Sequence, residues 1–116
     1  MFGFSLKEKA IKILENDIGH YNPTNSWLNH IVKQGKSQEF NEYDVVINYL
    51  MTEWEFKINQ CLQSPDTFKK EIRKSWYKTI HDERKKFKLI EHKAHQDLDF
   101  RDRCSKIIKN SKTLIK

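Results

Sequence analysis

Apolar residues recur along most of the chain at three- and four-residue spacing, which is the repeat of an amphipathic α-helix. The first such series follows Ser5 and Glu8, whose spacing is that of a capping box at a helix start. It stops at Gly19, a residue type that readily adopts the left-handed conformation after a helix. The series predicts a helix over residues 6–18 from the apolar positions Leu6, Ala10, Ile13, Leu14 and Ile18.

Two shorter series each predict one further helix, one before and one after the middle of the chain. Residues 20–25 form a loop, since Pro23 disfavours helix before it, and Asn22 or Thr24 can cap the next helix. That short helix begins near Trp27 and ends at Gly35, with apolar positions Trp27, Leu28, Ile31 and Val32. Towards the C-terminus, a helix that starts at Asp97 or Asp99 has the apolar positions Phe100, Cys104, Ile107, Ile108 and Ile115.

The strongest series covers residues 43–62 and has two apolar stripes. A helix that is apolar on two sides usually lies at the centre of a bundle. A hairpin is the alternative, because residues 54–58 alternate like a strand, but no Asn-Gly or Asp-Gly turn divides the segment, so we favour one helix. The second stripe packs into the core or forms a dimer face. The stripes are Tyr43, Val46, Ile47, Leu50, Met51, Trp54, Ile58, Cys61 and Leu62, and Val45, Tyr49, Thr52 and Phe56.

The segment from Phe68 to Leu98 combines an apolar side with a basic side. Between Lys69 and Lys93 there are ten Lys/Arg and four Asp/Glu, a surplus of six that equals the formal net charge of the whole chain. On a helix, the apolar stripe contains Phe68, Ile72, Trp76, Thr79, Ile80, Phe87, Ile90, Ala94 and Leu98, with the basic residues opposite. This segment therefore offers both a core face and a charged face.

An unbroken helix from Pro65 to Leu98 would be about 50 Å long, whereas a compact domain of this size is roughly 35 Å across. Ser64-Pro65-Asp66 is typical of a helix start. The helix either protrudes or breaks, at 81–83, where Glu83 interrupts the apolar stripe, or at 95–97. Together the patterns predict an all-α fold, with residues 1–116 as a single domain. We expect a bundle of about five helices whose long basic helix packs on the central helix 43–62.

Composition supports a helical cytoplasmic protein. Three Gly and two Pro in 116 residues are too few for a turn-rich β-sandwich or barrel. Cys61 and Cys104 favour reduced thiols over a disulfide. The first residues do not resemble a signal peptide, and no apolar run approaches the roughly 18–20 residues of a membrane span. We therefore expect no membrane association.

The sequence contains no motif that indicates catalysis, a metal or a cofactor. His92 and His95 are spaced to share a metal, but the further ligands would have to come from Glu91, Asp97 or Asp99, and solvated surface histidines are the simpler interpretation. Neither cysteine belongs to a Cys-x-x-Cys pair, and the three glycines are isolated, which excludes a Gly-rich phosphate loop. We predict a protein that is not an enzyme and holds no metal or cofactor.

The basic side of helix 66–93 is the candidate binding surface. It is either an ordinary solvated helix face or a docking face for an anionic partner. Nucleic acid would bind it with a strong salt dependence, with Tyr77 placed to stack on a base. An acidic protein would be steered to it by charge. The predicted partner-binding residues are Lys70, Arg73, Lys74, Tyr77, Lys78, His81, Arg84, Lys85 and Lys88.

In its size, compact helical outline and absence of catalytic residues, the chain resembles the small helical immunity proteins paired with bacterial toxins, such as those of contact-dependent growth inhibition. The resemblance implies an inhibitor that covers the active site of a cognate toxin, often a nuclease. We therefore expect a non-enzymatic, protein-binding immunity protein. A nucleic-acid-binding protein that uses the same basic face is the alternative.

Overall fold

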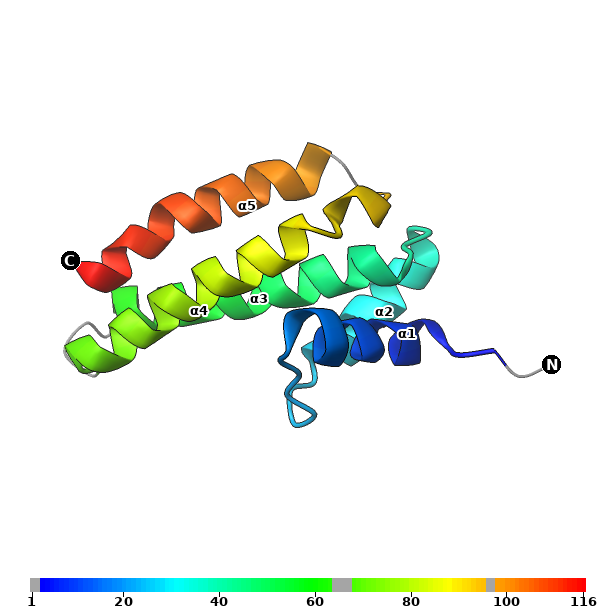
Figure 1. Cartoon of the computed structure of the whole chain (residues 1–116), viewed down its shortest axis with the longest axis horizontal. Helices are drawn as coiled ribbons and strands as arrows, with labels where there is room; N and C mark the ends of the chain where they lie inside the picture. Colours follow the sequence, from blue (N-terminus) through cyan, green and yellow to red (C-terminus); the bar gives the residue numbers. More distant parts are fainter. Residues whose placement is uncertain (1–2, 64–67, 96–97) are drawn as a thin grey trace.

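The computed structural model describes residues 3–63, 68–95 and 98–116, and within these ranges every regular element is a helix. The α-helices are α1 (Leu6–Ile13), α2 (Trp27–Ser37), α3 (Glu42–Gln63), α4 (Lys70–Lys88) and α5 (Leu98–Ser111). A π-helical turn, Leu14–Ile18, extends α1, and 3₁₀ turns cover Glu91–Lys93 and Lys112–Ile115. The predicted all-α bundle is confirmed (Figure 1).

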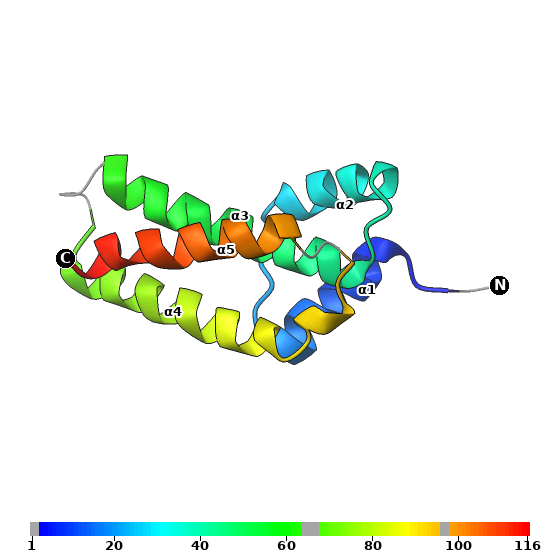
Figure 2. The same ribbon diagram turned by 90° about the horizontal axis from the view of Figure 1, so that it is seen from above.

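Helix α3 is the centre of the bundle, and each of the other four α-helices packs against it. Helices α4 and α5 run beside it along the long axis of the molecule, while α1 and α2 flank its N-terminal half (Figures 1 and 2). The molecule is elongated, with extents of 52 × 29 × 24 Å. This arrangement confirms the prediction that the basic helix packs on a central helix.

The segment 43–62 is one helix, so the hairpin alternative is wrong. Both of its apolar stripes contribute to the core, because Val45 and Tyr49 of the weaker stripe are as fully buried as Val46 and Leu50 of the stronger one. Only the C-terminal end of the weaker stripe reaches the surface, where Phe56 is 49% exposed. The stripe is therefore mostly core packing, as its central position requires.

The two glycines predicted to end helices behave differently. Gly19 ends the π-helical turn with φ 84°, and its N–H donates to Leu14 O at 2.8 Å. Gly35 does not end α2, which continues to Ser37. A Cβ at Gly35 would lie 2.8 Å from the Phe40 ring, so this glycine provides room for a close contact rather than a helix stop.

The long basic helix ends earlier than predicted. Helix α4 runs unbroken through 81–83, so the first of the two candidate breaks is absent; Glu83 is instead buried within the helix face that packs on α3. The helix ends at Lys88, before the second predicted break, whose residues 96–97 lie outside the described residues. The predicted start at Ser64-Pro65-Asp66 also lies outside them. Ile72, assigned to the core, is 42% exposed.

The segment after α4 is fastened to the start of α3 by hydrogen bonds. Asn41 and Asp44 cap each other's backbone N–H groups there, at 3.0 and 2.9 Å. The second Asp44 oxygen accepts from the His95 N–H at 2.9 Å, and Asn41 Nδ2 donates to Lys93 O at 2.7 Å. This fixes the segment after α4 against the start of α3, and α5 then runs beside α3 and α4 (Figure 2).

Candidate functional site

The nine residues predicted to form the basic face all lie on α4, but they divide into two groups. Five lysines are exposed to solvent, and we call them the lysine face: Lys70, Lys74, Lys78, Lys85 and Lys88. The other four are partly buried towards the C-terminal segment and α5: Arg73, Tyr77, His81 and Arg84. The sequence pattern placed both groups on one arc of the helix, and the packing of α5 separates them.

The four partly buried residues make contacts within the molecule. Arg73 Nη1 donates to the backbone O of Lys116 at 3.0 Å. The rings of Tyr77 and His81 pack against each other with centroids 4.2 Å apart and planes tilted by 41°, and His81 Nε2 lies 3.1 Å from the Ser111 hydroxyl. Because the hydroxyl itself donates to a backbone carbonyl, His81 Nε2 is the donor in that pair. These residues help to join α4 to the C-terminal segment.

His81 and Arg84 do not present free charge to a partner. Burial is the main cause that lowers the pKa of His81, and the nearby Lys85 lowers it further while Asp82 acts in the opposite direction. The imidazole is therefore neutral at pH 7. The Arg84 guanidinium forms an ion pair with Glu91 at 3.0 Å. Positive charge available for binding is accordingly concentrated in the lysine face.

The lysines of this face are not held in ion pairs by the described residues, although the exposed carboxylates of Glu71 and Asp82 lie on the same side of α4. None of its five ammonium groups forms an ion pair with any described residue. Beside it, Arg84, Lys109 and Lys112 line a groove between α4 and α5 of about 380 Å³. The basic surface thus extends from α4 onto the C-terminal helix.

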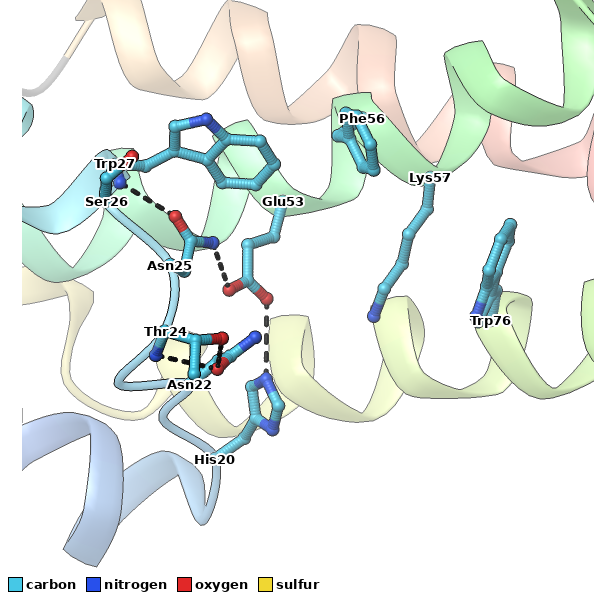
Figure 3. A pocket seen from close by; sticks show the side chains of 10 residues that line it. All are labelled: His20, Asn22, Thr24, Asn25, Ser26, Trp27, Glu53, Phe56, Lys57 and Trp76. Atoms are coloured by element: carbon cyan, nitrogen blue, oxygen red, sulfur yellow. Dashed lines mark hydrogen bonds and ion pairs between the residues drawn. The ribbon is translucent and has the colours of Figure 1, made fainter.

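A larger pocket of about 510 Å³ opens on another side of α4 (Figure 3). It lies between α3, α4 and the loop that joins the π-helical turn to α2. We call it the aromatic pocket, because Trp27, Phe56 and Trp76 contribute rings from α2, α3 and α4. Its other lining residues are His20, Asn22, Thr24, Asn25, Ser26, Glu53 and Lys57.

A buried carboxylate organises the polar wall of the aromatic pocket. Glu53 is 6% exposed, accepts a hydrogen bond from Asn25 Nδ2 at 3.1 Å and lies 3.4 Å from His20 Nε2 (Figure 3). The Tyr49 hydroxyl accepts from the Asn22 N–H at 3.3 Å, and burial first, then the nearby Glu53, raise the pKa of Tyr49. Glu53 therefore holds the loop against α3 through Asn25 and His20.

The start of α2 depends on the same loop. Asn22 Oδ1 accepts from the Thr24 N–H at 3.0 Å, which tightens the turn after Pro23. Asn25 Oδ1 accepts from the Trp27 N–H at 2.7 Å, so Asn25 caps the helix in place of the predicted Asn22 or Thr24. Asn25 thereby links Trp27 on one wall of the aromatic pocket to Glu53 on another.

A second buried carboxyl, that of Glu83, is outside the pocket lining but interacts electrostatically with the pocket residues Lys57, His20 and Glu53. Glu83 is 4% exposed and its Oε1 accepts from the buried Trp54 indole N–H at 3.2 Å. Its Oε2 accepts no hydrogen bond from the part of the chain that the structure describes. Burial is the main cause that raises the pKa of Glu83, against lowering by the Trp54 hydrogen bond and then by Lys57 and His20.

Sequence reasoning missed the aromatic pocket because its residues had ordinary structural explanations. Trp27 and Trp76 were assigned to apolar stripes, and no motif singled out Glu53. Glu83 carried the available signal: a carboxylate inside an apolar stripe marks either a helix break or a buried charge, and we named it only as a candidate break. The three-element pocket itself depends on tertiary packing.

The cysteines and histidines do not converge on a reactive or metal-binding centre within the described residues. Cys61 and Cys104 are free and buried. Burial raises the pKa of Cys104 to about 11, and it also raises the pKa of Cys61. His92 and His95 are exposed, and no described group of three His, Cys, Asp or Glu is arranged to hold a metal ion.

None of the described helices has the length and apolar character needed to cross a membrane. No protein-family model, curated protein or solved structure matches this chain.

Proposed function

We propose that this chain is a non-enzymatic inhibitor that binds another protein through the lysine face, in the manner of a toxin-immunity protein. The observation that carries the proposal is the set of five exposed lysines on one side of α4, none of which forms an ion pair with a described residue. Like charges on one helix face repel each other, and an acidic partner surface would relieve that repulsion. The face is therefore better suited to an anionic surface than to solvent alone.

The backbone beneath the lysine face supports binding without a large rearrangement. Helix α4 packs against α3 and α5 along its length, and Lys86 Nζ on its final turn donates to Ile18 O at 3.0 Å. A preorganised face loses less conformational entropy on association than a mobile segment does. Charge steering would raise the association rate, and it would weaken as salt is added.

Nucleic acid is the second candidate partner, since Lys109 and Lys112 in the groove between α4 and α5 add ammonium groups beside the lysine face. The expected stacking role of Tyr77 has little support, because its ring is partly buried against His81. Binding by this route would depend on phosphate contacts and would be largely independent of sequence.

The proposed compartment is the cytoplasm. The two cysteines are free thiols, and disulfides are rare in reducing compartments. A cytoplasmic inhibitor of this kind would meet its toxin after the toxin enters the cell.

The test first asks whether a large secreted protein with a variable C-terminal domain is encoded directly upstream. That C-terminal domain, as the candidate toxin, is then co-expressed with this chain. The variant Lys74→Glu/Lys78→Glu/Lys85→Glu reverses three charges of the lysine face. The control, Lys9→Glu/Lys33→Glu/Lys36→Glu, reverses three exposed lysines on α1 and α2. Each reversal removes two charge units, so both variants fall from +6 to a formal charge of zero.

We expect wild type and control to restore growth and to bind the toxin domain, while the lysine-face variant loses both. Equal protection by both variants would contradict the proposal. Filter binding to random DNA and RNA from 50 to 300 mM salt tests the second candidate. A steep salt slope that falls by roughly 0.9 per lost contact in the lysine-face variant alone would favour nucleic acid instead.

A further inference from the structure

We propose that the aromatic pocket is a second binding site, and that it takes an organic cation of the alkylguanidinium class, either as a free small molecule or as an arginine side chain. The site is separate from the lysine face. At 100° per residue, Trp76 lies about 200° around α4 from Lys74 and Lys78. The proposal therefore does not rest on the proposed function.

Three aromatic rings supply surfaces that favour a planar cation. Trp27 and Phe56 meet edge to face with centroids 5.2 Å apart, and Trp76 packs beside Phe68 at 4.9 Å. Guanidinium groups are weakly hydrated and stack on aromatic faces. Within the described ranges, the chain's own cations lie over the rings of Phe4 and Tyr43 and over none of the three pocket rings.

Carboxyl groups in and near the pocket favour a cation over an anion. Glu53 lines the pocket, and Glu83, which is outside the lining, has its Oε2 without a hydrogen bond among the described residues. The charged groups that act on Glu83 are Lys57, His20 and Glu53, and all three line the pocket. A cation bound there would therefore lie beside Glu53 and would also favour the ionised form of Glu83.

Lys57 is the internal cation of the aromatic pocket. Its side chain extends from α3 towards α4, between Glu53 and Trp76 in the view of Figure 3. It forms no ion pair with a described residue, so no close contact fixes its ammonium group. A lysine side chain is long and flexible, and a bound guanidinium would displace this ammonium towards solvent.

The same groups argue against an anionic ligand. The pocket lining contains the Glu53 carboxyl, the Lys57 ammonium and the His20 imidazole, and the Glu83 carboxyl interacts with all three. An anion could pair with Lys57 but would come close to the Glu53 carboxylate. Removing Lys57 should therefore raise the affinity of the pocket for a cation and lower its affinity for an anion.

The experiment compares n-butylguanidinium with n-butylurea, which has nearly the same shape and no charge, by calorimetric titration of the intact chain at pH 7.5. We expect the guanidinium to bind at least about tenfold more tightly than the urea. The two solvent-accessible pocket tryptophans, Trp27 and Trp76, should show indole N–H shifts in NMR spectra, assigned with Trp→Phe variants. Equal affinity for the two probes, or no guanidinium binding at 10 mM, would overturn the proposal.

Variants of the pocket test the charge argument. Lys57→Gln should tighten guanidinium binding about two- to fivefold, since it removes a competing cation. The matched control Lys33→Gln removes an exposed lysine of α2 and should leave binding unchanged. Glu83→Gln, which keeps an oxygen for the Trp54 hydrogen bond, should weaken binding severalfold. Weaker binding in Lys57→Gln would show an anion site and refute the proposal.

A blocked Gly-Arg-Gly peptide separates the two sources of the cation. Tighter binding of the peptide than of n-butylguanidinium would assign the aromatic pocket to an arginine of a partner protein. Binding of the free cation without the peptide would assign it to a small molecule. Both results support a guanidinium site, and circular dichroism of each variant checks that the fold is retained.

Discussion

Replacing Glu83 by glutamine is expected to remove a pH dependence of stability that the native carboxyl causes. In the folded chain this carboxyl is 4% exposed, and burial raises its pKa above the ordinary value of 4.5 despite the Trp54 hydrogen bond and the nearby Lys57. In the unfolded chain the carboxyl is solvated. The folded state therefore keeps a proton that the unfolded state releases.

The sign and size of the effect follow from this difference in proton binding. The Glu83 contribution to stability is fully present below the unfolded pKa of about 4.5 and is lost as pH rises through the higher folded pKa. For one proton, the loss cannot exceed about 1.4 kcal/mol per pH unit. Glutamine has no such titration and still offers an oxygen to the Trp54 indole N–H.

Urea unfolding of wild type and Glu83→Gln, followed by tryptophan fluorescence at half-unit steps from pH 4 to 8, measures the effect. The other ionisable groups are the same in both proteins, so their contributions largely cancel in the difference. We expect the stability of the variant relative to wild type to rise with pH and then level off. Glu15→Gln, at an exposed position on the π-helical turn, is the matched control for loss of a carboxylate. If the difference in unfolding free energy between Glu83→Gln and wild type does not change with pH, the reasoning is refuted.

Three further predictions concern packing. Gly35→Ala should cost about 1–3 kcal/mol in urea unfolding, because its Cβ would meet the Phe40 side chain at 2.8 Å, and the cost should vanish in a Phe40→Ala background. The buried Cys104 thiol, with its pKa raised to about 11, should react with a disulfide reagent at least about 100-fold faster in urea than in the native protein. Arg103→Ala should cost about 1 kcal/mol, since its guanidinium joins α5 to Asn48, Thr52 and Glu55 on α3, whereas Lys106→Ala should change stability by less than about 0.5 kcal/mol.

The helices themselves were predictable because their apolar spacing is regular over several turns. The capping box at Ser5 and the left-handed Gly19 mark the ends of the first helix as the local rules require. Gly35 shows the limit of these rules. A glycine near the end of an apolar series is typical of a helix stop. At position 35, however, a glycine is needed because the Phe40 side chain from the following loop packs against it, and no local sequence pattern indicates that contact.

The candidate surface was predictable only in part for a similar reason. Periodicity placed Arg73 and Lys74 on the same arc of one helix, although the structure buries part of the first and exposes the second. The difference arises from α5, which returns along one border of that arc. Its position depends on the connection after Lys88 and on the hydrogen bonds of Asp44, neither of which has a signature in the charge pattern.

The two proposed sites use opposite sides of one helix, and this makes their functions separable. Lys74 and Lys78 point away from α3, whereas Trp76 lies between them in sequence and lines the aromatic pocket against α3. A Lys74→Glu/Lys78→Glu change should therefore abolish docking of an acidic partner and leave guanidinium binding nearly unchanged, while Trp76→Ala should do the reverse. If either change removed both activities while α4 stayed helical, the two surfaces would belong to one interface, and a partner would have to wrap around α4 to occupy it.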